Sequence, residues 1–171
     1  MNIALIGFMG VGKTTVSRAL SKRLGAEEID TDQWIVKKEG RAITEIFKTD
    51  GEQAFRDIET AAVEELSSLD GKILSCGGGA VLRPCNVEAL KRNGKIVLLT
   101  AKPETIFERV RHGKDRPILN GNMNVPYIAE LMEKRRPAYE AAADVSVSTD
   151  GKSPAAIAKE IEAFMKSVRP V

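Results

Sequence analysis

Residues 7–14 read Gly-Phe-Met-Gly-Val-Gly-Lys-Thr and match the phosphate-binding loop pattern G-x-x-x-x-G-K-[ST] at every fixed position. The pattern lies between an apolar run of strand length, residues 2–6, and a stretch with helical apolar periodicity, residues 14–24. In this order, glycines let backbone N–H groups surround phosphate oxygens, and the helix N-terminus adds a favourable dipole. Lys13 is expected to contact the β- and γ-phosphates, and the Thr14 hydroxyl to bind Mg²⁺. The sequence therefore predicts a nucleoside triphosphate site, with a chance glycine-rich turn as the alternative.

Composition limits the other classes of partner. The 171 residues carry 26 basic and 24 acidic side chains, a formal net charge of +2, so no strong field favours nucleic acid. No apolar stretch approaches the ~20 residues of a membrane helix, and the N-terminus lacks the features of a signal peptide. Cys76 and Cys85 are too few for a disulfide framework and lack zinc-ligand spacing. We expect one cytoplasmic domain spanning residues 1–171, with no nucleic-acid or membrane partner.

Strand-like apolar runs alternate with helical patterns along the chain. The runs are residues 2–6, 26–29, 72–75, 95–99 and 144–147, and the helical patterns are residues 14–24, 51–69, 86–92, 103–111, 125–143 and 153–168. This alternation predicts a parallel sheet covered by helices on both faces, with ligands at the carboxyl ends of the strands. Residues 31–55 and 113–124 interrupt the alternation. Extra segments of this kind usually contact a second substrate or cover the site.

Polar motifs follow the second and third runs. Asp30 and Asp32 can divide two tasks, holding the water shell of Mg²⁺ and accepting a proton from a substrate hydroxyl. The alternative for Asp32 is an N-cap of a helix over residues 33–38. Residues 77–79 are three glycines whose backbone can approach a ligand closely, or form a flexible turn. Because no acidic residue ends the third run, Asp30 is expected to replace the usual second acidic magnesium motif.

Three arginines each have two interpretations. Arg56 can bind an anion or pair with Glu59, three residues further along a helix face. Arg116 can stabilise charge on a transferred phosphoryl group from a closing loop, or be a solvated loop charge. Arg135 can bind an anion or remain a cation on a helix surface. None of the three is convincing alone.

Taken together, the motifs resemble those of shikimate kinases. They are GFMGVGKTT, DTD, TDGEQAFR, GGG, RPIL and R-x-P-x-Y, and their order and spacing agree from residue 2 to about residue 150. The resemblance implies a three-layer α/β/α fold of the P-loop type with a five-stranded parallel sheet. It also implies a small substrate-binding segment at about residues 31–60, a lid at about residues 110–125, and a monomer. The implied activity is transfer of the γ-phosphate of ATP to the 3-hydroxyl of shikimate, with Mg²⁺, in aromatic amino-acid synthesis.

The resemblance also implies roles for individual residues. The metal ligands are Thr14 and Asp30, and the catalytic residues are Lys13, Asp32 and Arg116. The ATP-binding residues are Gly10, Val11, Gly12, Lys13, Thr14, Thr15, Arg109 and Arg116. The shikimate-binding residues are Asp32, Arg56, Gly77, Gly78, Gly79 and Arg135, with the two arginines on the carboxylate.

Two other functions remain open at this point. A kinase for gluconate or a nucleoside monophosphate can use the same scaffold, although the aromatic-poor substrate segment offers little for stacking a base. A catalytically silent ATP-binding module is the alternative outside enzymes, and the presence of Lys13, Thr14, Asp32 and the arginines argues against it.

Overall fold

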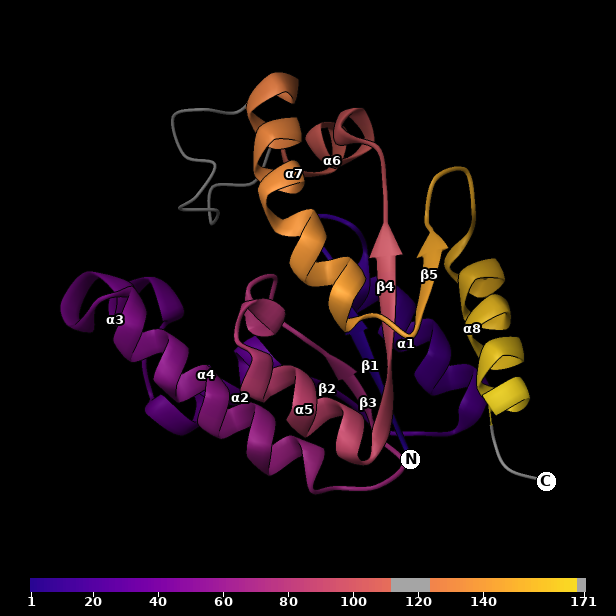
Figure 1. Cartoon of the computed structure of the whole chain (residues 1–171), viewed down its shortest axis with the longest axis horizontal. Coiled ribbons are helices and arrows are strands. Elements are labelled where there is room, and N and C mark those ends of the chain that lie inside the picture. Colours follow the sequence, from indigo (N-terminus) through magenta and orange to yellow (C-terminus); the bar gives the residue numbers. More distant parts are fainter. Residues whose placement is uncertain (112–123, 169–171) are drawn as a thin grey trace.

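Five parallel strands form the centre of the molecule in the order β2-β3-β1-β4-β5 (Figure 1). A computed structural model describes residues 1–111 and 124–168. The strands are β1 (Asn2–Ile6), β2 (Glu28–Asp30), β3 (Ile73–Ser75), β4 (Gly94–Thr100) and β5 (Val145–Ser148). All five residues of β1 are buried, as expected for a central parallel strand covered on both faces. The predicted fold class is confirmed.

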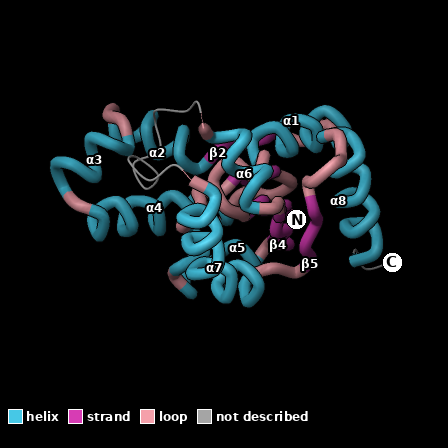
Figure 2. Tube along the Cα trace, turned by 90° about the horizontal axis from the view of Figure 1, so that it is seen from above, coloured by secondary structure: helices cyan, strands magenta, loops and turns pink. Residues whose placement is uncertain are grey.

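Helices cover both faces of this sheet. Figure 2 shows α1 (Lys13–Leu24) and α8 (Pro154–Val168) along one side, and α5 (Pro84–Arg92) and α7 (Val125–Ala142) along the other. A short 3₁₀ helix, η1 (Ala80–Leu82), precedes α5, and α6 (Pro103–Val110) follows β4. The main hydrophobic core lies between these layers, and its fully buried side chains include Leu5, Leu20, Leu66, Leu74, Ile96 and Ile106.

The interruption predicted at residues 31–55 is helical. It contains α2 (Thr31–Glu39), α3 (Ile43–Asp50) and the first turn of α4 (Glu52–Ser67), and these helices project from one end of the molecule (Figure 1). A second, smaller hydrophobic cluster holds them together, formed by Ile35, Ile46, Phe55 and Ala62. This segment therefore has its own packing and supports the carboxyl end of β2.

The capping interpretation of Asp32 is wrong. Helix α2 begins at Thr31, and the side chain of Asp30 accepts a hydrogen bond from the backbone N–H of Gln33 at 3.0 Å. Asp30 is thus the N-cap. Asp32 lies in the first turn of α2 and does not cap the helix.

Part of the predicted lid, together with Arg116, lies outside the described residues. The described chain resumes at Asn124, which caps α7 by accepting a hydrogen bond from the N–H of Tyr127 at 2.9 Å. In the portions of the chain that the structure covers, no helix combines the length and apolar character needed to cross a membrane.

We expect Ile46→Ala to lower the free energy of unfolding by about 2–5 kcal/mol, because Ile46 is fully buried in the small cluster. Val36→Ala is the matched control, since Val36 is 38% exposed on α2 of the same segment. Urea unfolding of both variants measures the difference. Equal losses of stability would show that the cluster does not hold these helices.

Candidate functional site

The phosphate-binding loop connects β1 to α1, as its sequence predicts. Gly10 and Gly12 adopt φ angles of 78° and 103°, in the left-handed region that favours glycine. A Cβ at Gly10 would also lie 2.5 Å from Cγ1 of Val110, so this position admits no side chain. Gly12 is the N-cap of α1 and offers no side-chain hydrogen bond, which leaves the N-terminus of the helix open to an anion.

Lys13 lies at the mouth of this loop. Its Nζ donates to the carbonyl oxygen of Gly7 at 2.6 Å and to that of Phe8 at 3.2 Å. The ammonium group is therefore held beside the loop by the loop's own backbone. The side chain remains within the cavity described next.

One cavity of about 530 Å³ collects the predicted site residues from distant parts of the chain. Its lining includes the predicted residues Gly10, Gly12, Lys13, Thr14, Thr15, Asp30, Asp32, Arg56, Gly77, Gly78, Gly79, Arg109 and Arg135. Val11 is not part of this lining, because its side chain is buried and its N–H donates to the carbonyl of Phe8 at 3.2 Å. The other lining residues are Met9, Phe55, Glu59, Ser75 and Cys76.

Asp32 is the carboxylate most strongly affected by the cavity. Its pKa is raised from 3.8 to about 6, mainly by burial and then by the negative charges of Asp30 and Glu59. The positive charges of Lys13 and Arg56 act in the opposite direction. A carboxylate with this pKa can accept a hydroxyl proton near neutral pH.

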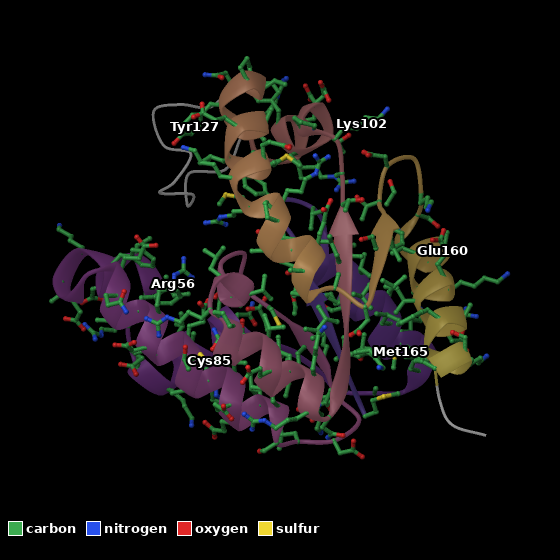
Figure 3. All side chains as sticks on the ribbon, viewed as in Figure 1. Arg56, Cys85, Lys102, Tyr127, Glu160 and Met165 are labelled. Carbon is green, nitrogen blue, oxygen red and sulfur yellow. The ribbon has the colours of Figure 1, made fainter. Side chains whose placement is uncertain are left out.

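Arg56 and Glu59 form a buried ion pair. Nη1 of Arg56 lies 2.8 Å from Oε1 of Glu59, and their side chains are 11% and 1% exposed. Burial raises the pKa of Glu59, and the guanidinium of Arg56 opposes this rise. Both sequence interpretations of Arg56 are therefore compatible with the structure: it pairs with Glu59, and it faces the cavity (labelled in Figure 3).

Glu59 is a site residue that the sequence analysis did not select. Its Oε2 is buried and has no hydrogen-bond partner within the described residues. A signal was present in the sequence, because Glu59 occupies the same face of α4 as the buried residues Phe55, Ala62 and Leu66. A charged residue on an otherwise apolar helix face indicates a paired or functional group.

The triple-glycine segment lines the cavity, and two hydrogen bonds attach it to neighbouring elements. The N–H of Gly77 donates to Oγ1 of Thr31 at 3.0 Å, and the Tyr139 hydroxyl donates to the carbonyl of Gly78 at 2.6 Å. A site residue approaches each glycine where a Cβ would lie: Asp32 at Gly77, Arg135 at Gly78 and Arg56 at Gly79. The glycines make room for these three charged groups to converge.

Arg135 completes the basic side of the cavity. It extends from α7, and its guanidinium carbon lies 5.9 Å from the ring centroid of Phe8 in the phosphate-binding loop. A cation over an aromatic face is weakly attracted to it, which helps to orient the arginine. Arg56 and Arg135 thus reach one cavity from two helices that are far apart in sequence.

Cys76 also lines the cavity but is not suited to nucleophilic chemistry. It is fully buried, and burial raises the pKa of its thiol to about 12. The thiolate is therefore scarce at neutral pH, and Cys76 is part of the wall.

Comparisons with known proteins agree with this site. A family model described as shikimate kinase matches residues 9–166. The shikimate kinase of Dehalococcoides mccartyi is 42% identical over 161 residues, which cover 94% of this chain and 91% of that protein. The shikimate kinase of Moorella thermoacetica is 42% identical over 166 residues, which cover 97% and 95%.

Solved structures show the same relationship. The structure of shikimate kinase from Acinetobacter baumannii in complex with shikimate matches with a TM-score of 0.93 and 35% identity, covering 99% of this chain and 95% of that one. A gluconokinase from Sinorhizobium meliloti matches with a TM-score of 0.63 at 20% identity, which shows a shared fold alone. From the family model and the identity to these relatives, the chain belongs to the shikimate kinase family.

Proposed function

We propose that this protein transfers the γ-phosphate of ATP to the 3-hydroxyl of shikimate, giving shikimate 3-phosphate and ADP. One observation carries the proposal: a single cavity joins a phosphate-binding loop to a carboxylate of raised pKa and two arginines. Shikimate is a carboxylate with three hydroxyl groups, and its chemistry matches that set of side chains. The reaction serves aromatic amino-acid synthesis.

Arg56 and Arg135 are proposed to bind the shikimate carboxylate. Guanidinium groups suit planar carboxylates, and the two side chains approach neighbouring glycines, Arg135 at Gly78 and Arg56 at Gly79. The ion pair with Glu59 holds the Arg56 guanidinium at the wall of the cavity. Helices α2–α4, at about residues 31–60, are the proposed substrate-binding segment.

The phosphate-binding loop and Lys13 are proposed to bind the triphosphate, with Thr14 and Asp30 as ligands of Mg²⁺. The donors fit this ion, because Mg²⁺ prefers oxygen and takes few protein ligands beside water and phosphate. Within the described residues no group of three acidic, histidine or cysteine side chains forms a denser metal site. When bound, the ion neutralises charge on the β- and γ-phosphates.

Asp32 is proposed to bind the reacting hydroxyl and accept its proton. Its carboxylate lies beside Gly77 and lines the same cavity as Lys13, Arg56 and Arg135, which supports this role. Phosphoryl transfer then depends on positioning and on stabilising the developing charge. Arg116, outside the described residues, completes this proposal as the arginine that contacts the transferred phosphoryl group. We further propose that the enzyme acts as a monomer in the cytoplasm.

We expect rapid ADP formation from Mg-ATP that depends on shikimate, with stoichiometric shikimate 3-phosphate. A coupled assay follows ADP, and mass spectrometry follows the phosphorylated product. Gluconate and nucleoside monophosphates serve as competing acceptors. Equal turnover of any of these would contradict the proposed substrate, and ATP binding without transfer to any acceptor would support the silent-module alternative.

We expect kcat/KM for shikimate to fall about tenfold per pH unit below about pH 6, because protonation of Asp32 removes the proton acceptor. The raised pKa gives the sign: the carboxylate is ionised above about pH 6 and neutral below it. Rate profiles from pH 4.5 to 8 measure the effect. Asp32→Asn should lower kcat by about 10²–10⁴ and abolish this acid limb. A wild-type profile that stays flat down to pH 4.5 would refute the assignment.

We expect Gly79→Ala to raise the KM for shikimate by about tenfold while leaving ATP affinity within about twofold. The new methyl group displaces the Arg56 guanidinium from its position. A hydrogen bond to a charged group contributes about 1.5–3 kcal/mol, which is enough for this change in KM. Gly79 has a φ of −102°, so alanine is allowed by the backbone. Steady-state kinetics with each substrate varied measure the split. Leu82→Ala is the control, because Leu82 is 43% exposed in the adjoining helix η1 and does not line the cavity. An unchanged KM for shikimate in Gly79→Ala would remove Arg56 from the carboxylate site.

A further inference from the structure

Arg109 contacts the phosphate-binding loop directly. It lies in the last turn of α6, and its Nη1 donates to the carbonyl oxygen of Val11 at 2.9 Å and to that of Gly10 at 3.3 Å. The same nitrogen donates to Oγ1 of Thr149 at 3.3 Å. The family resemblance implies only that Arg109 binds ATP, and contact with ATP does not account for three hydrogen bonds to the protein itself.

The partners of Arg109 are themselves fixed. Thr149 is 3% exposed, and its hydroxyl donates to the carbonyl of Thr100 at the end of β4 at 3.0 Å. The adjacent Asp150 accepts hydrogen bonds from the Thr105 hydroxyl at 2.6 Å and from the Lys102 N–H at 2.9 Å. The segment after β5 is thus attached both to β4 and to the start of α6. Arg109 joins this assembly to the phosphate-binding loop.

Peptide geometry links the Val11 carbonyl to the backbone N–H of Gly12, a residue that lines the cavity. In a trans peptide the C=O and the following N–H point in opposite directions. A Val11 carbonyl held by Arg109 therefore directs the N–H of Gly12 away from Arg109. Gly12 lines the cavity and caps α1, where an anion is favoured.

Helix α6 supports the loop by packing as well. A Cβ at Gly10 would meet Val110 at 2.5 Å and Ile106 at 3.7 Å, so two buried side chains of α6 press against this glycine. Figure 1 shows α6 above the carboxyl end of β4, the edge of the sheet where the loop lies. Apolar contact limits where the loop can move, and the hydrogen bonds from Arg109 fix the direction of its peptide groups.

We propose that Arg109 is a positioning residue of the phosphate-binding loop, which it holds in the conformation that binds the triphosphate. The proposal rests on the proposed function only in that the loop binds a triphosphate. It predicts that Arg109 contributes to affinity even when the ligand has no base and no ribose. Contact with adenine alone predicts no such contribution.

The test compares ATP with inorganic tripolyphosphate, both with Mg²⁺, by titration calorimetry without shikimate. Arg109→Met should weaken binding of both ligands by a similar factor of about tenfold or more, because it removes charge-assisted hydrogen bonds to the loop. Arg92→Met is the matched control: Arg92 is 63% exposed on α5, pairs with Glu64, and does not line the cavity. Its affinities should equal those of the wild type.

Arg109→Lys separates positioning from simple attraction of charge. The lysine keeps the positive charge but replaces the planar guanidinium with a compact ammonium group. We expect Arg109→Lys to bind both ligands severalfold more weakly than the wild type. If Arg109→Met does not fold, Arg109→Lys still tests the proposal. Wild-type affinity of Arg109→Met for tripolyphosphate, or full recovery in Arg109→Lys, would overturn the proposal. Because shikimate is absent, a wrong acceptor substrate would leave these results unchanged.

Discussion

The ion pair between Arg56 and Glu59 is the interaction on which the proposed substrate side of the cavity depends. Removing two charges from water is costly, and a pair at 2.8 Å recovers that cost only when both partners are held in position. Helix α4 holds them, because its other buried residues pack into both hydrophobic clusters. Glu59 also contributes to the raised pKa of Asp32, so the pair influences the carboxylate that we propose as the proton acceptor. The positive charge of Arg56 also influences the pKa of both Asp32 and Glu59.

Much of the fold could be predicted from the sequence because its signals are local. A parallel strand buried on both faces is a continuous apolar run, and β1 matches its predicted range of residues 2–6. The least accurate strand is β2, predicted at residues 26–29 and observed at Glu28–Asp30. Its last residue, Asp30, belongs to the strand, and its side chain caps the next helix. A pattern of apolar residues cannot predict a polar residue of this kind. The shikimate kinase resemblance is confirmed by the comparisons.

The details of the site were harder to predict because they depend on contacts between distant residues. Arg135 and Gly78 are 57 positions apart, yet a Cβ on Gly78 would lie 3.1 Å from the guanidinium. The depth of the Arg56–Glu59 pair follows from the packing of α4, which sequence spacing does not reveal. Residues 31–55 could be recognised as an interruption, but their helices are defined by a cluster that includes Ala62 from further along the chain. The assigned roles of individual site residues stay predictions.

Glycines have different roles in the phosphate-binding loop and at residues 77–79. Glycines free the loop to surround phosphates, but the same freedom would let it adopt many conformations without a ligand. Ordering the loop therefore requires contacts from outside it, and these come from Val110 against Gly10 and from Arg109 on two carbonyls. At residues 77–79 the glycines instead admit charged side chains that are already fixed. Contacts from α6 can order the loop before a ligand binds, and the ion pair with Glu59 can do the same for Arg56. Such order in the free protein lowers the entropic cost of binding.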